Sequence, residues 1–285
     1  MPGRKGWLGR VIGDFVRRLR QYDIMMMAAG IAFYWLLAII PLLLLGSSIV
    51  GYVLGSSERG VDEVMTMLRR LIPAATGRDV ELFLRSIVES RYVTGALGIG
   101  FLLWVGIGVF DAITSSLTTL SGERETRSYV RRKLVAFVML ATAGLLFVAA
   151  LIGGWVLAAW PEIEALIGAR VVLPPFITAP GFPRFATSGL LACLLAIVYR
   201  VAPVRAIRWP WAISGASVAA AFWFEARVLF NMYLMHYARY NLFYGILGGF
   251  IGLVLWVFYT AIILLLGGLL ADVLDRAAGP PGGRA

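Results

Sequence analysis

The 285-residue chain is 60% hydrophobic and only 15% charged, a balance that excludes an ordinary soluble domain. Its net charge of +10 comes mainly from basic residues in the loops beside apolar segments, which favours membrane topology over a nucleic-acid partner. One cysteine and one histidine cannot build a disulfide framework or a zinc cluster, so we expect no metal and no other cofactor.

Residues 1–24 are predicted to form an amphipathic helix on the cytoplasmic membrane surface. Trp7, Val11, Ile12 and Phe15 recur at helical spacing, and arginines fill much of the other face. That basic face would attract anionic lipid, although a plain positive-inside anchor explains the same arginines. No short apolar core with a cleavage site precedes the first long apolar segment, so we expect that segment to be retained as a span.

Six apolar segments follow, and five of them reach the ~20 residues that a helix needs to cross a membrane. The fourth segment is short between Arg184 and Arg200, and it spans only if these side chains extend toward the membrane surfaces. The sequence therefore predicts an all-α, polytopic membrane protein, with one six-span domain over 25–273 and a tail at 274–285. The predicted spans are 25–54, 94–120, 134–160, 185–203, 211–234 and 244–271.

The charges of the loops predict how these spans are oriented. The N-terminal segment, the loop 121–133 and the loop after residue 199 are rich in basic residues, whereas the loops 55–93 and 161–184 carry balanced charge. Basic loops stay in the cytoplasm, and an even number of spans returns the chain to its starting side. We therefore expect both termini and the tail in the cytoplasm.

The loop 55–93 is predicted to contain a pair of amphipathic helices over about 58–91. Apolar residues repeat at helical spacing on both sides of the sequence PAATG, residues 73–77. Neither stretch is long or apolar enough to span, so each should lie on the outer surface or cover a cavity between the spans.

Proline and glycine mark positions where the spans bend or approach closely. Pro41 lacks a backbone amide hydrogen in the middle of the first span and should kink it. Glycines four residues apart at the start of the last span favour close packing, within one chain or between copies in a homo-oligomer. With the tyrosine before them, these positions are Tyr244, Gly245, Gly248, Gly249 and Gly252.

Three ionisable residues, Asp111, Glu225 and Arg227, fall well inside predicted spans. Each costs ~2.5–3.5 kcal/mol at the middle of a bilayer, so each needs a compensating environment. Glu225 and Arg227 are separated by about 200° around a helix and cannot satisfy each other. Arg227 can extend outward beside Asn231 as an anchor, whereas the short side chain of Glu225 must face protein or water.

Glu225 shares a helical stripe with Ser214 and His236, each eleven residues away, and this stripe is a candidate polar path. Asp111 and Glu225 are expected to differ by ~12 Å in their depth in the membrane, so direct pairing of Asp111 with residues of this stripe is disfavoured. Two acidic groups at staggered depths suit a path across the membrane. Two separate, hydrogen-bonded structural carboxylates fit the same pattern.

The sequence lacks the motifs of common hydrolases. H-E-x-x-H, G-x-S-x-G and the P-loop pattern are absent. The serine, glutamate and histidine of the fifth span lie ~16 Å apart per eleven residues, which is too far for a catalytic triad on one helix. We therefore expect a protein that is not an enzyme.

Two runs of residues are distinctive: A-F-Y-x-L-L-x-x-x-P, which ends at Pro41, and Y-G-I-L-G at 244–248. They belong to four stretches that together resemble the YihY/BrkB family of bacterial inner-membrane proteins. The resemblance implies six spans, cytoplasmic termini and acidic residues at Asp111 and Glu225. Family members often continue the second span with D-x-A-L-N-x-x-W, but this chain reads D-A-I-T-S-S-L-T and lacks the amide and the tryptophan. The four stretches are 27–45, 71–87, 199–209 and 224–273.

The resemblance also bears on function. Members of that family were once labelled ribonuclease BN, a label now regarded as mistaken, and others were linked to serum resistance or suspected of moving lipids. We therefore expect a protein that transports or flips a lipid or another amphiphile. A non-catalytic scaffold in envelope assembly or resistance is the alternative, and a membrane-bound hydrolase or nuclease is a third.

Overall fold

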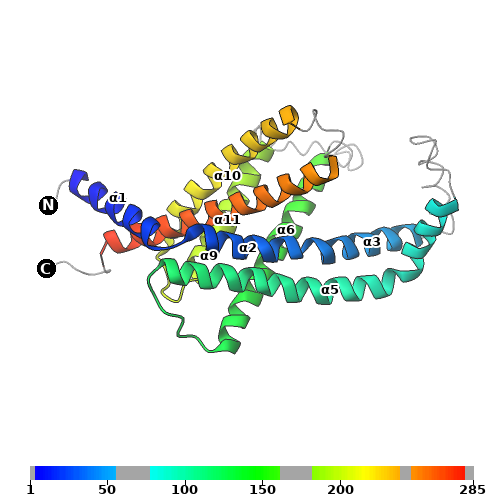
Figure 1. Cartoon of the computed structure of the whole chain (residues 1–285), viewed down its shortest axis with the longest axis horizontal. Coiled ribbons are helices and arrows are strands. Elements are labelled where there is room, and N and C mark those ends of the chain that lie inside the picture. Colours follow the sequence, from blue (N-terminus) through cyan, green and yellow to red (C-terminus); the bar gives the residue numbers. More distant parts are fainter. Residues whose placement is uncertain (1–3, 56–77, 161–181, 238–244, 280–285) are drawn as a thin grey trace. The chain divides into compact units, whose positions relative to one another are not determined.

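The computed structural model describes residues 4–55, 78–160, 182–237 and 245–279. All the regular elements within these ranges are helices (Figure 1), which confirms the predicted all-α class. The helices are α1 (Arg4–Gln21), α2 (Ile24–Leu37), α3 (Ile39–Gly55), α5 (Arg78–Leu120), α6 (Tyr129–Ala158), α9 (Phe182–Val201), α10 (Trp209–Tyr237) and α11 (Gly245–Ala277).

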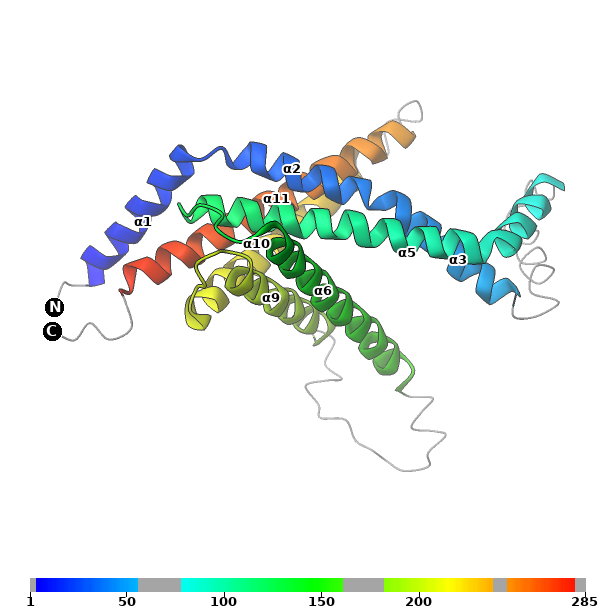
Figure 2. The ribbon, with the colours of Figure 1, turned by 90° about the horizontal axis from the view of Figure 1, so that it is seen from below.

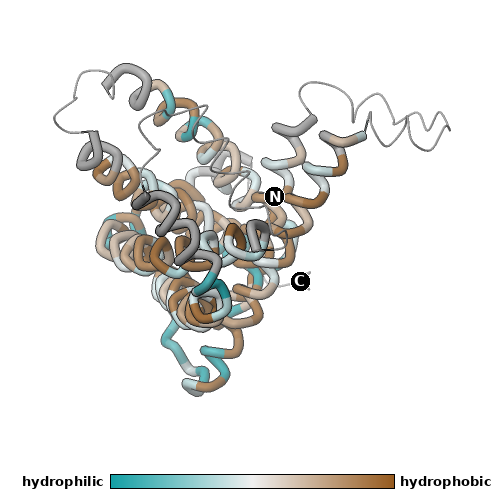
Figure 3. Tube along the Cα trace, turned by 90° about the vertical axis from the view of Figure 1, so that its right-hand side faces the viewer, coloured by the Kyte–Doolittle hydropathy of each residue, from teal (hydrophilic) through white to brown (hydrophobic). Residues whose placement is uncertain are grey.

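Five stretches of the described residues are long and apolar enough to cross a membrane. They are Ile24–Tyr52, Glu89–Leu120, Tyr129–Val156, Trp209–Met232 and Phe250–Ala277. The remaining predicted span coincides with α9, whose apolar stretch, Ala186–Val201, is shorter. Hydrophobic residues predominate along many of these helices (Figure 3), as expected of helices that cross a membrane.

The first span is interrupted at Ala38, between α2 and α3. The interruption lies one turn before Pro41, whose ring would clash with the carbonyl of Leu37, four residues earlier, in a continuous helix. The amide of Ala38 instead bonds the carbonyl oxygens of both Tyr34 and Trp35, at 3.1 and 3.2 Å, so the chain tightens there before it continues.

The second predicted amphipathic helix of the loop 55–93 is continuous with the second span. The sequence suggests separate helices, but α5 runs for 43 residues from Arg78 to Leu120. No proline or glycine occurs between Arg78 and Thr94, so nothing in that part of the sequence ends the helix. The first amphipathic helix of the predicted pair and the PAATG sequence lie outside the described residues.

The chain divides into two compact units, one of residues 33–108 and one of residues 1–32 with 109–285. In the first unit, glycines of α5 leave room for side chains of α2 and α3. A Cβ at Gly108 would lie 2.7 Å from the ring of Tyr34, and a Cβ at Gly95 would lie 2.6 Å from Oγ of Ser48. The hydroxyl of Ser48 donates to the carbonyl of Arg91 at 2.7 Å, which joins α3 to α5.

The core of the second unit is built from α9, α10 and α11, and α6 runs beside α9 (Figure 2). Tyr199 of α9 is fully buried, and its hydroxyl donates to the carbonyl of Leu264 at 2.8 Å. Gly215 of α10 meets the backbone of Gly267 on α11, and buried alanines continue the contact along α10. Small residues thus let the helix backbones approach closely.

Among the predicted packing glycines of the last span, Gly252 is buried. The surroundings of Gly245, Gly248 and Gly249, and the position of Tyr244, lie outside the described residues. Packing by these glycines, within the chain or between copies, therefore stays a prediction.

Replacing Gly215 tests the close contact between α10 and α11. A Cβ at this position would lie 2.6 Å from the carbonyl oxygen of Gly267, so we expect Gly215→Ala to cost about 1–3 kcal/mol through overpacking. Gly144 of α6 is the matched control, because a Cβ there meets nothing within 4 Å. Gly144→Ala should leave the thermal unfolding midpoint in detergent unchanged or raised, and equal midpoints for the two variants would refute the contact.

Candidate functional site

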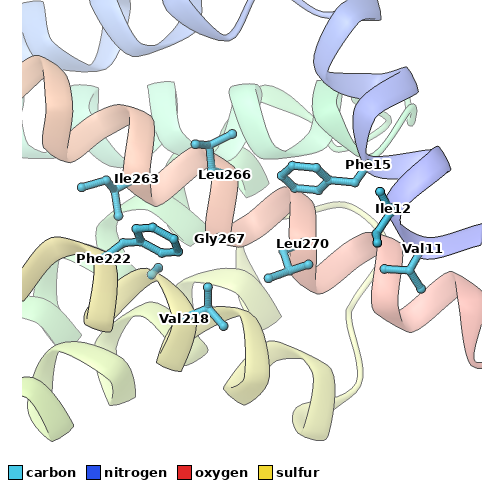
Figure 4. Close-up of a pocket in the computed structure, with 10 residues that line it drawn as sticks. Val11, Ile12, Phe15, Val218, Phe222, Ile263, Leu266, Gly267 and Leu270 are labelled. Carbon is cyan, nitrogen blue, oxygen red and sulfur yellow. The ribbon is translucent and has the colours of Figure 1, made fainter. Parts of the chain in front are cut away.

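An apolar cavity of about 410 Å³ lies between α1, α10 and α11 (Figure 4). Its volume falls within the ~300–1,000 Å³ typical of ligand pockets. The three helices supply only apolar side chains and one glycine to its lining. The lining residues are Val11, Ile12, Phe15, Val218, Ala219, Phe222, Ile263, Leu266, Gly267 and Leu270.

The amphipathic helix α1 forms one wall of this cavity with the apolar face that the sequence predicts. Ile12 of α1 and Phe222 of α10 line the cavity and yet are 58% and 65% exposed. Such exposure places them at its rim, so the cavity is open to the surface beside each of them. A molecule can therefore reach the interior without displacing the packed core of α9, α10 and α11.

An ion pair holds α1 at this position. Arg18, in the last turn of α1, contacts the carboxylate of Asp272 at 2.7 Å and donates to the carbonyl of Leu120 at 3.1 Å. The side chain of Asp272 is 2% exposed and also accepts from Nε of Arg276, at 2.8 Å. On α11, Asp272 lies two residues beyond Leu270, the last residue of that helix that lines the cavity.

A second buried carboxylate, Asp275, lies one turn further along α11. It accepts from Nε of Arg208 at 2.5 Å and from Nη2 of Arg205 at 3.1 Å, both in the loop between α9 and α10. Arg276 donates to the carbonyl oxygen of Ser121, the residue that follows the end of α5, at 2.6 Å. The two aspartates therefore tie α1, the α9–α10 loop and the segment after α5 to the end of α11.

Sequence reasoning missed Asp272 and Asp275 because the predicted last span ends at residue 271. The signal was present in the sequence, as two aspartates three residues apart at the end of an apolar helix. Carboxylates are unfavourable near the negative end of a helix dipole, so they need cations beside them. The α9–α10 loop supplies such cations to Asp275, and α1 supplies Arg18 to Asp272.

Asp111 is paired with two cations of α6. Its carboxylate contacts Nε of Arg132 at 2.7 Å and Nζ of Lys133 at 2.8 Å. Both cations belong to the basic loop region predicted to be cytoplasmic, and they reach along α5 toward a carboxylate that is 13% exposed. Within the described residues Asp111 makes no contact with Glu225, and its pairing accounts for its charge locally.

Glu225 differs from Asp111, because it is exposed and makes no hydrogen bond or ion pair with any described residue. It lies three residues after Phe222 and seven after Val218, which places all three on one face of α10. Ser214 lies one turn before Val218, and its hydroxyl donates to the carbonyl oxygen of Pro210 at 2.7 Å. Ser214 and Glu225, the described members of the predicted polar stripe, therefore flank the cavity-lining residues of α10 along the helix.

The other predicted residues of this helix lie farther along it. Arg227 is exposed, and its guanidinium carbon lies 5.4 Å from the ring centroid of Phe224, so Arg227 does not pair with Glu225. Asn231 is exposed one turn beyond Arg227. His236 belongs to α10, but its side chain lies outside the described part of the structure. Among the described residues, no group of His, Cys, Asp and Glu could hold a metal ion.

Replacing Asp272 tests the ion cluster at the end of α11. Asp272→Asn leaves Arg18 and Arg276 without their shared carboxylate, and we expect a loss of roughly 3 kcal/mol in stability. The matched control is Asp14→Asn, which breaks an exposed pair with Arg17 and should cost at most about 0.5 kcal/mol. Equal unfolding midpoints for the two variants would show that the cluster does not hold the fold.

Two further variants separate a paired carboxylate from an unpaired one. Asp111→Asn should lower stability by about 1–2 kcal/mol, because Arg132 and Lys133 lose their partner. Glu225→Gln should change stability by less than about 0.5 kcal/mol, since no described residue pairs with Glu225. Thermal unfolding in one detergent checks both, and the reverse order of stabilities would contradict the assignment.

Comparison with known proteins identifies relatives over most of the chain. The ribonuclease-like protein YfkH of Bacillus subtilis is 25% identical over 253 residues, which cover 87% of this chain and 89% of YfkH. A UPF0761 membrane protein of Kangiella koreensis is 25% identical over 276 residues, 97% of this chain. Another, from Chromobacterium violaceum, is 23% identical over 259 residues, 91% of this chain. The chain spans 66% and 60% of the length of these two membrane proteins.

No solved structure matches the chain. The sequence model of the family described as virulence factor BrkB matches residues 15–284, which is nearly the whole chain and includes most of the cavity lining and the ion cluster. This match confirms the resemblance seen in the sequence. The protein therefore belongs to the virulence factor BrkB family of membrane proteins.

Proposed function

We propose that this protein moves a lipid or another amphiphile across the bacterial inner membrane. The observation that carries the proposal is Glu225, an exposed carboxylate without a described partner, on the same face of α10 as the cavity-lining Val218 and Phe222. A carboxylate inside a span costs ~2.5–3.5 kcal/mol, and such residues usually mark a pathway for ions or substrates.

The cavity and the carboxylate together suit an amphiphile. An amphiphile needs an apolar surface for its chains and a polar or charged group for its head as it passes the hydrocarbon region. Val218 and Phe222 supply the first, and Glu225, one turn further along α10, supplies the second. A purely polar solute would find no hydrogen-bonding side chain among the residues that line the cavity.

The proposed orientation places the ion cluster and both termini on the cytoplasmic side. The basic loops after α5 and after α9 meet at this end of α11, and basic loops remain in the cytoplasm. In this orientation α1 lies at the cytoplasmic surface, and the cavity belongs to the cytoplasmic leaflet. Glu225 then lies ~21 Å along its span from the cytoplasmic end, beyond the cavity.

A non-catalytic scaffold is the second candidate. The observation in its favour is that the carboxylates of Asp111, Asp272 and Asp275 are all engaged by basic side chains, which is what a packing role for these described carboxylates requires. Both candidates are non-enzymatic. The name ribonuclease-like belongs to the relative YfkH, and we do not extend that activity to this chain.

Lipid scrambling by the purified protein in liposomes tests the proposal. Dithionite destroys the fluorescence of a labelled lipid only in the outer leaflet, so without movement between leaflets about half of the fluorescence remains. If the protein moves lipid between leaflets, more than half of the fluorescence is lost. We expect nearly complete loss with the wild-type protein and a rate at least about tenfold lower with Glu225→Gln, a difference of ~1.4 kcal/mol in the barrier. Arg227→Gln is the matched control, because it removes a neighbouring exposed charge from another face of α10.

The two candidate functions give different outcomes in this assay. Full activity in Glu225→Gln would remove the carboxylate from the mechanism. Half of the signal remaining with the wild-type protein, as in protein-free liposomes, would set lipid scrambling aside and favour the scaffold. Equal losses in Glu225→Gln and Arg227→Gln would show that charge in general, rather than this carboxylate, supports transport.

A further inference from the structure

We infer that the cavity between α1, α10 and α11 binds an acyl chain of an anionic phospholipid from the cytoplasmic leaflet, with the lipid phosphate beside the arginines of α1. The inference rests on the proposed function, because it names the substrate class and the place where the substrate first binds. Four observations support it: the depth of the cavity, its lining, its rim and the charge of α1.

The depth of the cavity matches one leaflet. Along α11 the lining extends from Ile263 to Leu270, which is ~10.5 Å at 1.5 Å per residue. Half of a ~30 Å hydrocarbon layer is ~15 Å. On α11 the lining stops at Leu270, two residues before the paired Asp272, and its length is about two thirds of the depth of one leaflet.

The lining and the rim select an apolar chain that enters from the side. No lining residue carries a polar side chain, so a headgroup inside the cavity would lose its hydrogen bonds to water without replacement. Ile12 of α1 and Phe222 of α10 are exposed apolar residues at two sides of the cavity (Figure 4). An acyl chain already in the leaflet can pass this rim without crossing a polar region.

The positive charge of α1 favours an anionic headgroup on the lipid whose acyl chain occupies the cavity. The helix contains six basic residues and one acidic residue, Asp14. Arg18 is occupied by Asp272, but Arg20 is exposed, and Arg17 stays exposed although it contacts Asp14. Basic residues of an interfacial helix attract anionic headgroups at the membrane surface. A second copy of this chain is a poorer occupant, because its own α1 would bring like charges together.

Photo-cross-linking tests the inference directly. The protein is reconstituted into phosphatidylcholine vesicles that contain a trace of phosphatidylglycerol carrying a diazirine halfway along one acyl chain. After illumination, mass spectrometry locates the labelled residues. We expect labels on lining residues such as Phe15, Val218 and Leu266, and about tenfold weaker labelling by a phosphatidylcholine probe with the same chains.

Two variants fill the cavity from opposite walls. Val218→Trp and Ile12→Trp should each reduce labelling of the cavity roughly fivefold or more, because the added ring occupies the space of the chain. The matched control on α10 is Ile213→Trp, because Ile213 is exposed and does not line the cavity. Ile12 lies on an exposed helix surface, so its variant tests the cavity even if Val218→Trp does not fold.

A pair of double variants tests the charge of α1. Arg17→Gln with Arg20→Gln should reduce labelling by the anionic probe about tenfold and leave the phosphatidylcholine probe unaffected. Arg124→Gln with Arg131→Gln is the control, because it removes two exposed charges from the segment between α5 and α6 and the start of α6. Equal effects of the two double variants would overturn the assignment of the phosphate to α1.

Other outcomes also overturn the inference. Labels spread evenly over exposed apolar surfaces, such as Leu145 and Trp155 of α6, would show ordinary contact with bulk lipid. A disulfide between Ile12→Cys of one copy and Phe222→Cys of another, in a Cys193→Ser background, would place a second copy at the rim.

The scrambling assay separates this inference from the proposed function. Labels in the cavity of a protein that does not scramble lipid would leave the binding site in place and remove transport. Scrambling that survives the loss of labels in Val218→Trp and Ile12→Trp would leave transport in place and remove the cavity from its path. Loss of both activities in the two variants supports both statements.

Discussion

The pairing of Asp272 and Asp275 with arginines from other segments is the constraint on which the described helices around α11 depend. Both carboxylates are nearly buried at the negative end of the dipole of α11, where their charge is stable only with cations in contact. Those cations arrive from α1 and from the loop between α9 and α10, and Arg276 of α11 itself completes the set. The pairing of Asp272 with Arg18 therefore fixes where α1 lies, and α1 in that position forms a wall of the cavity.

The packing of α9, α10 and α11 is that expected of helices in a lipid membrane. Lipid chains are as apolar as leucine, so burial of large apolar residues gives helices little reason to associate, and close backbone contact replaces it. Accordingly α10 turns Gly215 and Ala219 toward the core, while Phe222 and Leu229 face outward. Glu225 lies on that outward surface, so its environment is whatever fills the space beside the helices.

Composition and periodicity predicted the class of the fold, because a long apolar run in the sequence identifies each membrane span. They also predicted the apolar face of α1, which forms a wall of the cavity. They did not predict the cavity or the ion cluster, because Arg18 and Asp272 meet only after distant segments have packed. For Asp111 the sequence showed an unfavourable charge within a span, but the partners, Arg132 and Lys133, became visible only from the geometry of α5 and α6.

The contact between Arg18 and Asp272 joins residues that are 254 positions apart. A chain is made from its N-terminus, so α1 exists long before the helix that anchors it, and several spans must enter the membrane in between. The position of α1 as a wall of the cavity is therefore fixed only after α11 has been synthesised. Before α11 is made, the apolar face of α1 has only the membrane surface to cover it, so the synthesis of α11 is what allows α1 to leave that surface contact and become a wall of the cavity.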